Sequence, residues 1–553
     1  MDDESFRFAA GYELPSYPFV MPPDLHATQP RTYPIVIVGA GLSGLTLACD
    51  LALRGIEAVV LDEDDTIGVR GASSRGICYA QKSLEIFARL GIYQRIRDKG
   101  VIWSVGKTRS GDDPVYTFDL RGDNPSEQPP FINLQQFYLE WFLVDRIQEL
   151  GRCDLRWKNR LTAIEPAGDH VLVSVDTPAG PYRLRAGYLV DATGANSPIR
   201  DALGLDAHVS RSGDRWCITD VRFKKPLPIE RWTWVDAPFN EGRAVWQHLM
   251  ADQVWRLDYQ MAPDCDPAIV SHPDVAGQRI RSQLGADTDF EFVWIGPYMY
   301  RDHLLDTFRQ GRILFIGDSA HVVSPFGARG GNSGIQDAAN LGWKLALVLA
   351  GQATDQLLDS YDAERQPAAQ ENLAVTSRTA RFLAPRSAAE HTLRRAVVAL
   401  ARRYEFARTM VNTGRMSIAN PYPPSPFLPQ GGFSVQNVAI SLPDRQPARL
   451  VDLLGASTRL VGIWFDARAA ESAGVLEAGV LELQKRWPLD VYRCGGDARL
   501  PAIGDPEGAL AGQLQASPGM FCLLRPDGYC AARIEHADCA AIGAALKAAL
   551  GHD

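Results

Sequence analysis

The chain has 553 residues, too many for one ordinary domain and enough for three or four. Hydrophobic residues make up 46% and charged residues 22% of the chain, which excludes a disordered protein. The net charge of −9 lacks the basic excess of nucleic-acid-binding proteins and favours a soluble protein that stays apart from anionic surfaces.

The cysteines and the N-terminus indicate a cytoplasmic protein. The nine cysteines are scattered and none forms a C-x-x-C pair, which predicts free thiols rather than disulfides or a zinc site. We see no other metal-ligand cluster. The first fifteen residues are acidic and lack the apolar core of a signal peptide, and no run of 18 apolar residues predicts a membrane span. We therefore expect no nucleic-acid or membrane partner.

A Pro-rich stretch over residues 1–33 predicts an extended arm on the surface. The sequence then changes to strand, glycine turn, helix and strand. Residues 34–38 (PIVIV) form a continuous apolar run, typical of a strand buried on both faces. An apolar helix over 42–53 follows and ends near Gly55, and EAVVLD at 57–62 predicts a second parallel strand.

The turn between this first strand and its helix is a dinucleotide-binding fingerprint, Gly39-Ala40-Gly41-Leu42-Ser43-Gly44. Gly39 permits the tight turn, Gly41 lets the backbone approach a pyrophosphate, and Gly44 lets helix and strand pack closely. The N–H groups at the helix N-terminus, which include that of Ser43, face the phosphates. Asp62 ends the second strand, where an acid receives the ribose hydroxyls, and Glu63 is the alternative.

Further elements follow in chain order. Amphipathic periodicity predicts helices over 82–99 and 134–150, and residues 153–190 alternate as short strands. An aromatic, mostly antiparallel sheet is expected over 207–300. A buried strand at 312–317, a helix at 334–350 and helices over 355–412 come next. A Pro-rich break at 421–429 then separates the mixed segment 431–553, which ends in a helix.

The stretch 311–337, GRILFIGDSAHVVSPFGARGGNSGIQD, resembles class A flavoprotein aromatic hydroxylases. The fingerprint, SSRGICYAQKSLEIF, LQQFYLEWFL, DATGANSPIR and LLDSYDAERQP extend the resemblance over about 34–375. The phenol hydroxylase and 3-(3-hydroxyphenyl)propionate hydroxylase-like branch is the most similar. The resemblance implies an α/β fold, the p-hydroxybenzoate hydroxylase-like fold, with a Rossmann-like FAD-binding domain, an inserted antiparallel substrate sheet and a C-terminal thioredoxin-like domain.

The expected domains follow from this resemblance. They are the arm at 1–33, the FAD-binding domain at 34–206 and 301–375, the substrate sheet at 207–300, a helical linker at 376–430, and a thioredoxin-like domain without C-x-x-C at 431–553. No flavin or substrate signature lies beyond Gly431, so truncation before about Gly431 is expected to leave the flavin site intact, and an effect on solubility or assembly stays open.

The resemblance also implies which residues bind FAD. Asp318 would accept hydrogen bonds from the ribityl hydroxyls, with a helix N-cap as the alternative role. The loop from Pro325 to Asn332, with Gly330 and Gly331, would bring N–H groups to the N1–C2=O edge of the flavin. Further FAD contacts are implied for Ser74, Arg75 and Gln136, with Gln135 as the rival of Gln136 by register.

Four further polar residues have less direct roles. Asp337 is expected to be structural, and so is His321. The family usually has Asp where Thr193 stands here, which puts efficient use of the nicotinamide in doubt. Asp191, two residues earlier, is interpreted as a strand-end residue, with compensation for the missing Asp as the alternative.

The implied reaction is hydroxylation of a phenol with NADPH or NADH and O₂, through a flavin C4a-hydroperoxide on noncovalently bound FAD. Loss of a nitro or halide substituent stays open, as does a homodimer. The alternatives are a reductase or an epoxidase on the same scaffold, acting on a quinone or a polyketide-like substrate.

A proton acceptor for the phenol is expected on the sheet at 207–300. We place it at His248, because its ordinary pKa near 6.5 suits proton transfer, with Asp258 as the second candidate. Period two puts Trp246 and His248 on one face of their strand and Gln247 on the other, and which face lines the pocket stays open.

Overall fold

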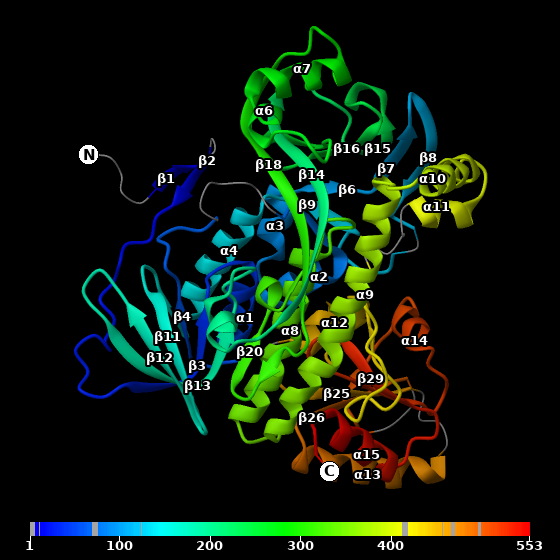
Figure 1. The fold of residues 1–553 in the computed structure, drawn as a ribbon. Coiled ribbons are helices and arrows are strands. Elements are labelled where there is room, and N and C mark those ends of the chain that lie inside the picture. Colours follow the sequence, from blue (N-terminus) through cyan, green and yellow to red (C-terminus); the bar gives the residue numbers. More distant parts are fainter. Residues whose placement is uncertain are drawn as a thin grey trace.

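In the computed structural model, residues 6–9, 12–68, 76–122, 124–411, 418–455, 457–465, 470–495 and 499–552 are described. Two eight-stranded sheets and a six-stranded C-terminal sheet are joined by long helices (Figure 1). Among the described residues, no helix has the length and apolar character needed to cross a membrane.

The first sheet carries the fingerprint. Its strands run in the order β10-β4-β3-β13-β12-β11, and β20 pairs with the end of β13. Their bounds are β3 (Arg31–Val38), β4 (Ala58–Leu61), β10 (Cys153–Arg156), β11 (Arg160–Ala167), β12 (His170–Asp176), β13 (Tyr182–Asp191), β19 (Arg309–Gln310) and β20 (Ile313–Phe315). The central strands are parallel and their apolar side chains are buried, because α1 (Leu42–Leu53), α4 (Gln136–Leu150) and α8 (Gly330–Leu349) pack here.

The second sheet contains the strands expected over 207–300 and extends beyond them. Its order is β21-β18-β14-β17-β16-β15-β7-β8. The strands are β7 (Val105–Ser110), β8 (Asp113–Asp119), β14 (Ala207–Phe223), β15 (Arg231–Ala237), β16 (Arg243–Leu249), β17 (Val254–Gln260), β18 (Phe290–Leu305) and β21 (His321–Val322). Only β15 and β7 pair in parallel, so residues 105–119 complete a sheet that is otherwise antiparallel.

A third, short sheet and several helices lie between these layers. The sheet consists of β5 (Cys78–Ala80), β6 (Val101–Trp103) and β9 (Phe131–Asn133). The single helix expected over 82–99 is wrong, since α2 (Gln81–Leu90) ends at Gly91 and α3 (Tyr93–Lys99) follows. Gly91 has a φ of +85°, the left-handed conformation that stops a helix.

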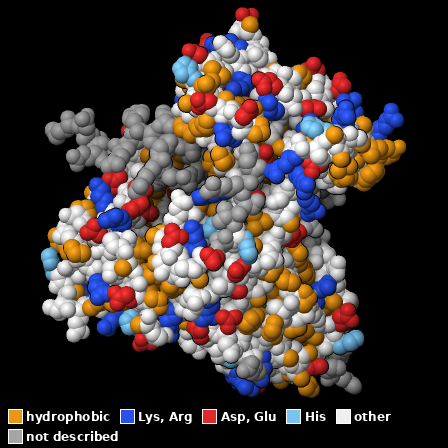
Figure 2. Space-filling view, viewed as in Figure 1, with side chains coloured by type: hydrophobic (Ala, Val, Ile, Leu, Met, Phe, Trp, Pro, Cys, Tyr) orange, Lys and Arg blue, Asp and Glu red, His pale blue; other side chains and the backbone are white. Residues whose placement is uncertain are grey.

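The remaining helices cover the sheets and the linker. They are α5 (Pro198–Ala202), α6 (Pro267–Val270), α7 (Pro273–Leu284), α9 (Asp359–Leu383), α10 (Ala388–Ala401) and α11 (Glu405–Val411). Figure 2 shows acidic and basic side chains interspersed on one face of the molecule, with hydrophobic side chains gathered over α10 and α11.

The C-terminal segment forms its own sheet, in the order β22-β29-β28-β25-β26-β27. Its strands are β22 (Phe433–Ser434), β25 (Leu460–Phe465), β26 (Leu489–Cys494), β27 (Ala502–Ile503), β28 (Phe521–Leu524) and β29 (Tyr529–Ile534), beside the pair β23 (Ala439–Ser441) and β24 (Pro447–Arg449). Helices α12 (Leu450–Leu454), α13 (Ala470–Arg486), α14 (Ala509–Leu514) and α15 (Cys539–Ala549) accompany it. Trp343, Leu347 and Leu357 share one buried apolar cluster with side chains of this segment.

The N-terminal arm includes a hairpin, β1 (Phe6–Ala9) and β2 (Tyr12–Pro15). Beyond the hairpin, the Tyr17 ring stacks on Trp157 with centroids 4.5 Å apart, and Thr66 donates a hydrogen bond to the Pro15 carbonyl at 2.7 Å. The arm is thereby fixed against the edge of the first sheet.

Candidate functional site

A cavity of about 760 Å³ extends from the fingerprint turn to the second sheet. The predicted residues that line it are Gly39, Gly41, Ser43, Asp62, Glu63, Gln136, His248, Asp258, Asp318, Pro325, Gly330, Gly331 and Asn332. Gly44 packs behind the turn, and Ser74 and Arg75 lie outside the described residues. The structure thus brings most of the predicted cofactor residues and both predicted catalytic residues to one space.

The turn after β3 has the geometry that its glycines predict. Gly39 has a φ of +107°, and a Cβ there would overlap the carbonyl oxygen of Ala192. A Cβ on Gly44 would overlap the carbonyl of Gly39. A Cβ on Gly41 would meet no atom within 4 Å, so this position faces open space. The N-terminal N–H groups of α1 therefore face a space that can admit a pyrophosphate.

Ser43 joins the fingerprint to the second flavin signature. A Cβ on Gly317 or on Gly334 would overlap the Ser43 hydroxyl oxygen, so both glycines are needed for this close approach. The start of α1, the turn after β20 and the first turns of α8 are packed together at this point.

Asp62 lies directly after β4, as the fingerprint requires. Its Oδ2 accepts the N–H of Ala40 at 2.6 Å, and its Oδ1 accepts the N–H of Asp64 at 2.8 Å. A carboxylate has about four acceptor positions, so the remaining ones can receive ribose hydroxyls. Burial raises the pKa of Asp62. Glu63, the alternative, lines the same cavity and is exposed.

Helix α4 holds both flanks of the segment 69–75. Gln136 Oε1 accepts the N–H of Gly76 at 3.1 Å, and Glu140 Oε2 accepts the N–H of Gly68 at 2.9 Å. The Gln136 amide also donates to Glu140 Oε1 at 2.9 Å. These side chains contact the residues on either side of the stretch that contains Ser74 and Arg75, which lies outside the described residues.

Gln135, the rival of Gln136, has a different role. Its amide donates to the Tyr12 hydroxyl at 2.8 Å and to the Ala251 carbonyl at 3.0 Å, and it is fully buried. Of the two glutamines, Gln136 is the one that lines the cavity.

Asp318 is exposed in the turn after β20 and faces the cavity. This turn, Gly317–Ser319, leads into strand β21 and not into a helix, so the alternative role of Asp318 as a helix cap is wrong.

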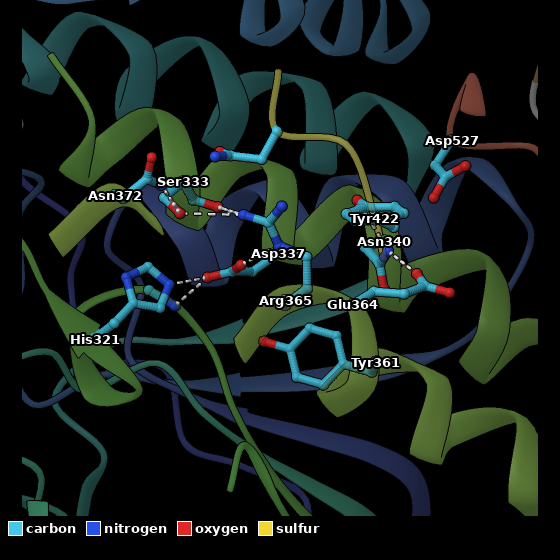
Figure 3. A network of polar contacts seen from close by, with 12 residues as sticks. His321, Ser333, Asp337, Asn340, Tyr361, Glu364, Arg365, Asn372, Tyr422 and Asp527 are labelled. Carbon is cyan, nitrogen blue, oxygen red and sulfur yellow. Dashed lines mark hydrogen bonds and ion pairs between the residues drawn. The ribbon is translucent and has the colours of Figure 1, made fainter. Parts of the chain in front are cut away.

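Asp337 on α8 binds this turn, and Figure 3 shows its carboxylate between His321 and Arg365. Its Oδ2 accepts the N–H of Gly317 at 3.1 Å and lies 2.6 Å from His321 Nε2, while Arg365 Nε donates to Oδ1 at 2.7 Å. Arg365 also donates to the Ser333 hydroxyl at 3.1 Å. Burial acts to raise the pKa of Asp337, but His321 and Arg365 outweigh it and bring the pKa to about 2. Arg365 is a residue that the sequence analysis missed.

Helix α8 begins four residues earlier than the sequence predicts, so Gly330, Gly331 and Asn332 form its first turn. The N–H groups of a first turn have no partner within the helix, so they can serve an electron-rich ligand edge. The Asn332 side chain meanwhile holds β5, because its Oδ1 accepts the N–H of Ala80 at 2.9 Å and its Nδ2 donates to the Cys78 carbonyl at 2.8 Å.

Asp191, at the end of β13, is satisfied by its own turn. Its Oδ1 accepts the Thr193 N–H at 2.9 Å and the Thr193 hydroxyl at 2.6 Å, and Ser197 donates to Oδ2. Burial raises its pKa. Thr193 thus stabilises the turn at the cavity wall and adds no charge to it.

The structure also settles which face of β16 lines the pocket. Trp246 and His248 face the cavity, whereas Gln247 accepts a hydrogen bond from Gln283 of α7 at 2.8 Å on the other side. Trp246 stacks on Trp216 with centroids 4.6 Å apart, and Phe326 of the Gly-rich loop meets its edge. Trp216, Trp246 and Phe326 thus form an aromatic wall that runs from the second sheet to the loop from Pro325 to Asn332.

Several charged side chains lie at the end of the cavity formed by the second sheet. Burial lowers the pKa of His248 well below 6.5, and Arg231 and Arg256 lower it further. Burial raises the pKa of Asp258 to about 6, although Arg256 opposes this rise. His248 Nε2 lies 3.7 Å from Asp258 Oδ2, and its Nδ1 is buried without a partner among the described residues. His248 was chosen because its ordinary pKa near 6.5 suits proton transfer, and in this structure its pKa lies well below that value.

Arg231, at the start of β15, is a second residue that the sequence analysis missed. It lines the cavity beside the Trp103 ring, and burial lowers its pKa. Arg256, in contrast, makes a bidentate ion pair with Asp220 at 2.9 and 3.0 Å. Within the described part of the chain, Arg231 makes no ion pair, which leaves its charge for a ligand.

The structure predicts that Asp62→Ala and Asp318→Ala each weaken FAD binding. Losing one hydrogen-bonded partner costs about 1–3 kcal/mol, or roughly five- to 150-fold in affinity. Fluorescence titration of apoprotein with FAD measures this effect. Glu63→Ala is the matched control and should change the affinity less. Wild-type affinity in both aspartate variants would contradict the assignment.

Comparison with known proteins supports a flavin site at this cavity. A family model described as FAD binding domain matches residues 32–376. Anhydrotetracycline monooxygenase of Streptomyces rimosus is 31% identical over 352 residues, which cover 61% of this chain and 67% of that protein. The 3-(3-hydroxy-phenyl)propionate/3-hydroxycinnamic acid hydroxylase of Mycolicibacterium smegmatis is 26% identical over 90% of both chains.

Solved structures confirm the expected fold. The flavin-dependent monooxygenase PieE, in complex with FAD and substrate, superposes with a TM-score of 0.79 at 20% identity over 95% of this chain and 100% of that chain. Aklavinone-11 hydroxylase with FAD and aklavinone gives 0.75 at 22% identity over the same shares. With the family match running from β3 through most of α9 and enclosing the cavity, the chain belongs to the class A flavin monooxygenases and is an FAD-dependent monooxygenase.

Proposed function

We propose that this chain hydroxylates a phenolic ring, with NADPH or NADH as electron donor and O₂ as oxygen source. The observation that carries the proposal is the cavity, in which the flavin residues and the cluster of Arg231, Arg256 and Asp258 share one space. Atoms balance when the phenol, O₂, NAD(P)H and a proton give the diol, water and NAD(P)⁺.

The residues present fit FAD. The N-terminus of α1 and Gly41 would hold the pyrophosphate, Asp62 a ribose hydroxyl and Asp318 the ribityl chain. Asp62 follows β4, Gly41 follows the neighbouring strand β3 and Asp318 follows β20, so the three line the cavity in the order of ribose, pyrophosphate and ribityl chain in FAD. The first turn of α8 would hold the N1–C2=O edge. Bound FAD supplies hydride uptake from the nicotinamide and oxygen transfer to the ring.

The proton acceptor in this proposal is Asp258, with His248 beside it. A buried carboxylate with a pKa of about 6 is ionised at neutral pH and basic enough to accept a phenolic proton. The guanidinium groups of Arg231 and Arg256 stabilise the resulting phenolate, whose ring is more electron-rich. Trp246 and Phe326 exclude water from the reacting ring.

A substrate panel tests the proposal. Simple phenols, hydroxyphenylpropionates, halophenols, nitrophenols and polycyclic phenols are screened for stimulated NAD(P)H oxidation, and the products of ¹⁸O₂ incubations are identified by mass spectrometry. Incorporation of one ¹⁸O atom into a phenol supports it. Turnover without O₂ would instead identify a quinone reductase, and an epoxide product would identify an epoxidase.

Polycyclic phenols form a second candidate substrate class. Anhydrotetracycline monooxygenase and 6-methylpretetramide 4-monooxygenase, both of Streptomyces rimosus, are named for such compounds, and the latter is 28% identical over 96% of this chain. The panel distinguishes the classes by kcat/KM. Release of nitrite or halide is measured in the same assay.

Hydroxylation should depend on the ionisation of Asp258. Since the pKa of Asp258 is about 6, the rate rises as pH increases through 6 and the carboxylate forms. Asp258→Asn should lose this rise and slow hydroxylation by about 10²- to 10⁴-fold, with H₂O₂ released in place of product. His248→Gln is the matched variant and should keep the rise. A wild-type pH profile in Asp258→Asn would remove Asp258 from the mechanism.

A further inference from the structure

We propose that Arg525, in the C-terminal turn between β28 and β29, is a positioning residue for the flavin site. The C-terminal sheet would then act as part of the cofactor site and not as an appendage. The proposal depends on FAD binding by this chain and not on the identity of its substrate.

Arg525 enters the FAD-binding part of the chain and pairs with Glu364 on α9. Its two terminal nitrogens donate to Glu364 Oε1 at 2.6 Å and to Oε2 at 2.8 Å. The same carboxylate accepts hydrogen bonds from Lys344 at 2.9 Å and Asn340 at 2.6 Å, both on α8. All four side chains are buried, so this cluster fixes α8, α9 and the C-terminal turn to one another.

Aromatic rings surround the Arg525 guanidinium. It lies 5.0 Å from the centroid of Trp343 on α8 and 5.4 Å from that of Tyr422. Tyr422 stacks on Tyr529 of β29 with centroids 4.1 Å apart. Asp527 pairs with Arg525 and orients it. A buried cation with this many directed contacts specifies one arrangement of its neighbours.

On α9 and α8, the residues next to this cluster contact the turn Gly317–Ser319, which faces the cavity. Figure 3 shows Glu364 and Arg365 on α9 beside Asn340 and Asp337 on α8. Arg365 follows Glu364 directly and pairs with Asp337, which accepts the Gly317 N–H beside Asp318. Helix α9 is thus held to α8 at two adjacent positions, one facing the C-terminal turn and one facing the cofactor. A shift of α9 at Glu364 would therefore move the support of the Gly317 turn.

A second set of contacts joins the C-terminal segment to α2, the helix that follows β5 at the cavity wall. Lys82 donates to the Asp527 carbonyl at 3.0 Å, and Glu85 accepts the N–H of Asn437 at 3.0 Å. Helix α2 follows β5, which the Asn332 side chain holds to the first turn of α8. The turn at 525–528 therefore contacts two of the helices that frame the flavin loop.

Arg525→Met in the full-length protein tests the proposal, since methionine keeps much of the side-chain volume and removes the charge. FAD affinity is measured by fluorescence titration of apoprotein, together with the visible spectrum of the bound flavin. We expect the dissociation constant of FAD to rise about tenfold, a usual size for coupling between sites, and the flavin bands to shift. Arg525→Lys, which keeps the charge, should restore most of the affinity.

Arg459→Met is the matched control. Arg459 pairs with Asp490 at 2.8 Å between two strands of the C-terminal sheet and, among the described residues, makes no hydrogen bond or ion pair to α9. Wild-type FAD affinity and spectrum in Arg525→Met, or an equal loss in Arg459→Met, would overturn the proposal. Should Arg525→Met not fold, Asp527→Asn removes the carboxylate that orients Arg525, and we expect about a threefold loss of affinity. An unchanged affinity in that variant also overturns the proposal.

Discussion

Asp337→Ala should lower the free energy of unfolding by about 3–5 kcal/mol, the usual cost of breaking a buried ion pair by removing one partner. Asp337 and Arg365 are fully buried, so the remaining guanidinium would have no solvent to replace the carboxylate. The N–H of Gly317 and the ring of His321 would lose the same acceptor. Urea unfolding of the apoprotein measures the loss.

Asp359→Ala is the control for this variant. Asp359 pairs with Arg309 at the surface, where an ion pair contributes about 0–1 kcal/mol. Because the pKa of Asp337 is about 2, below its unfolded value, the stabilisation is complete above about pH 4 and is lost as pH falls towards 2. The free energy of unfolding of Asp337→Ala should therefore fall less steeply between about pH 4 and pH 2 than that of the wild type. Equal stability of the variant and the wild type at pH 7 would contradict the network in Figure 3.

Truncation before Gly431 should destabilise the FAD-binding part of the chain, although the sequence motifs alone predict an intact flavin site. The buried side chains of Trp343, Leu347 and Leu357 pack in one cluster with the C-terminal segment. Exposing them costs roughly 1.5–3 kcal/mol each, against a typical total stability of about 5–15 kcal/mol. Truncation also leaves Glu364 without Arg525.

Soluble yield, thermal unfolding and FAD content of the truncated chain, beside the full-length protein prepared in the same way, measure this effect. We expect little soluble protein and less than full FAD occupancy. A truncated chain with the melting temperature and FAD content of the full-length protein would show that the C-terminal sheet is dispensable, and it would also refute the role of Arg525.

The local motifs were predictable because their function constrains a short run of residues. The glycines at 39, 41 and 44 and the acid at 62 lie on one strand-turn-helix-strand unit, so spacing alone places them. The alternation of Trp246 and His248 likewise follows from the two-residue period of a strand. The start of α8 was misplaced because Gly330 and Gly331 are poor helix formers, and only tertiary packing makes them helical.

The electrostatic environment could not be predicted in the same way. The pKa of His248 is lowered first by burial and then by Arg231, which belongs to another strand. Arg365 lies in the stretch LLDSYDAERQP but has no role assigned from the sequence, and Arg525 lies outside the motifs that carry the resemblance. The importance of both appears only when α8, α9 and the C-terminal turn come together. The order of strands in a sheet was not predictable either, because β7 and β15 pair although more than a hundred residues separate them.

The ion pair of Glu364 with Arg525 can form only late in the synthesis of the chain. The two residues are 161 positions apart, which the ribosome covers in about 8 to 32 seconds at roughly 5–20 residues per second. During that interval Glu364 has Lys344 and Asn340 as partners but lacks Arg525, and the apolar surface of Trp343 is uncovered. The apolar side chains of α8 that face the C-terminal segment therefore stay uncovered until β28 and β29 have been synthesised.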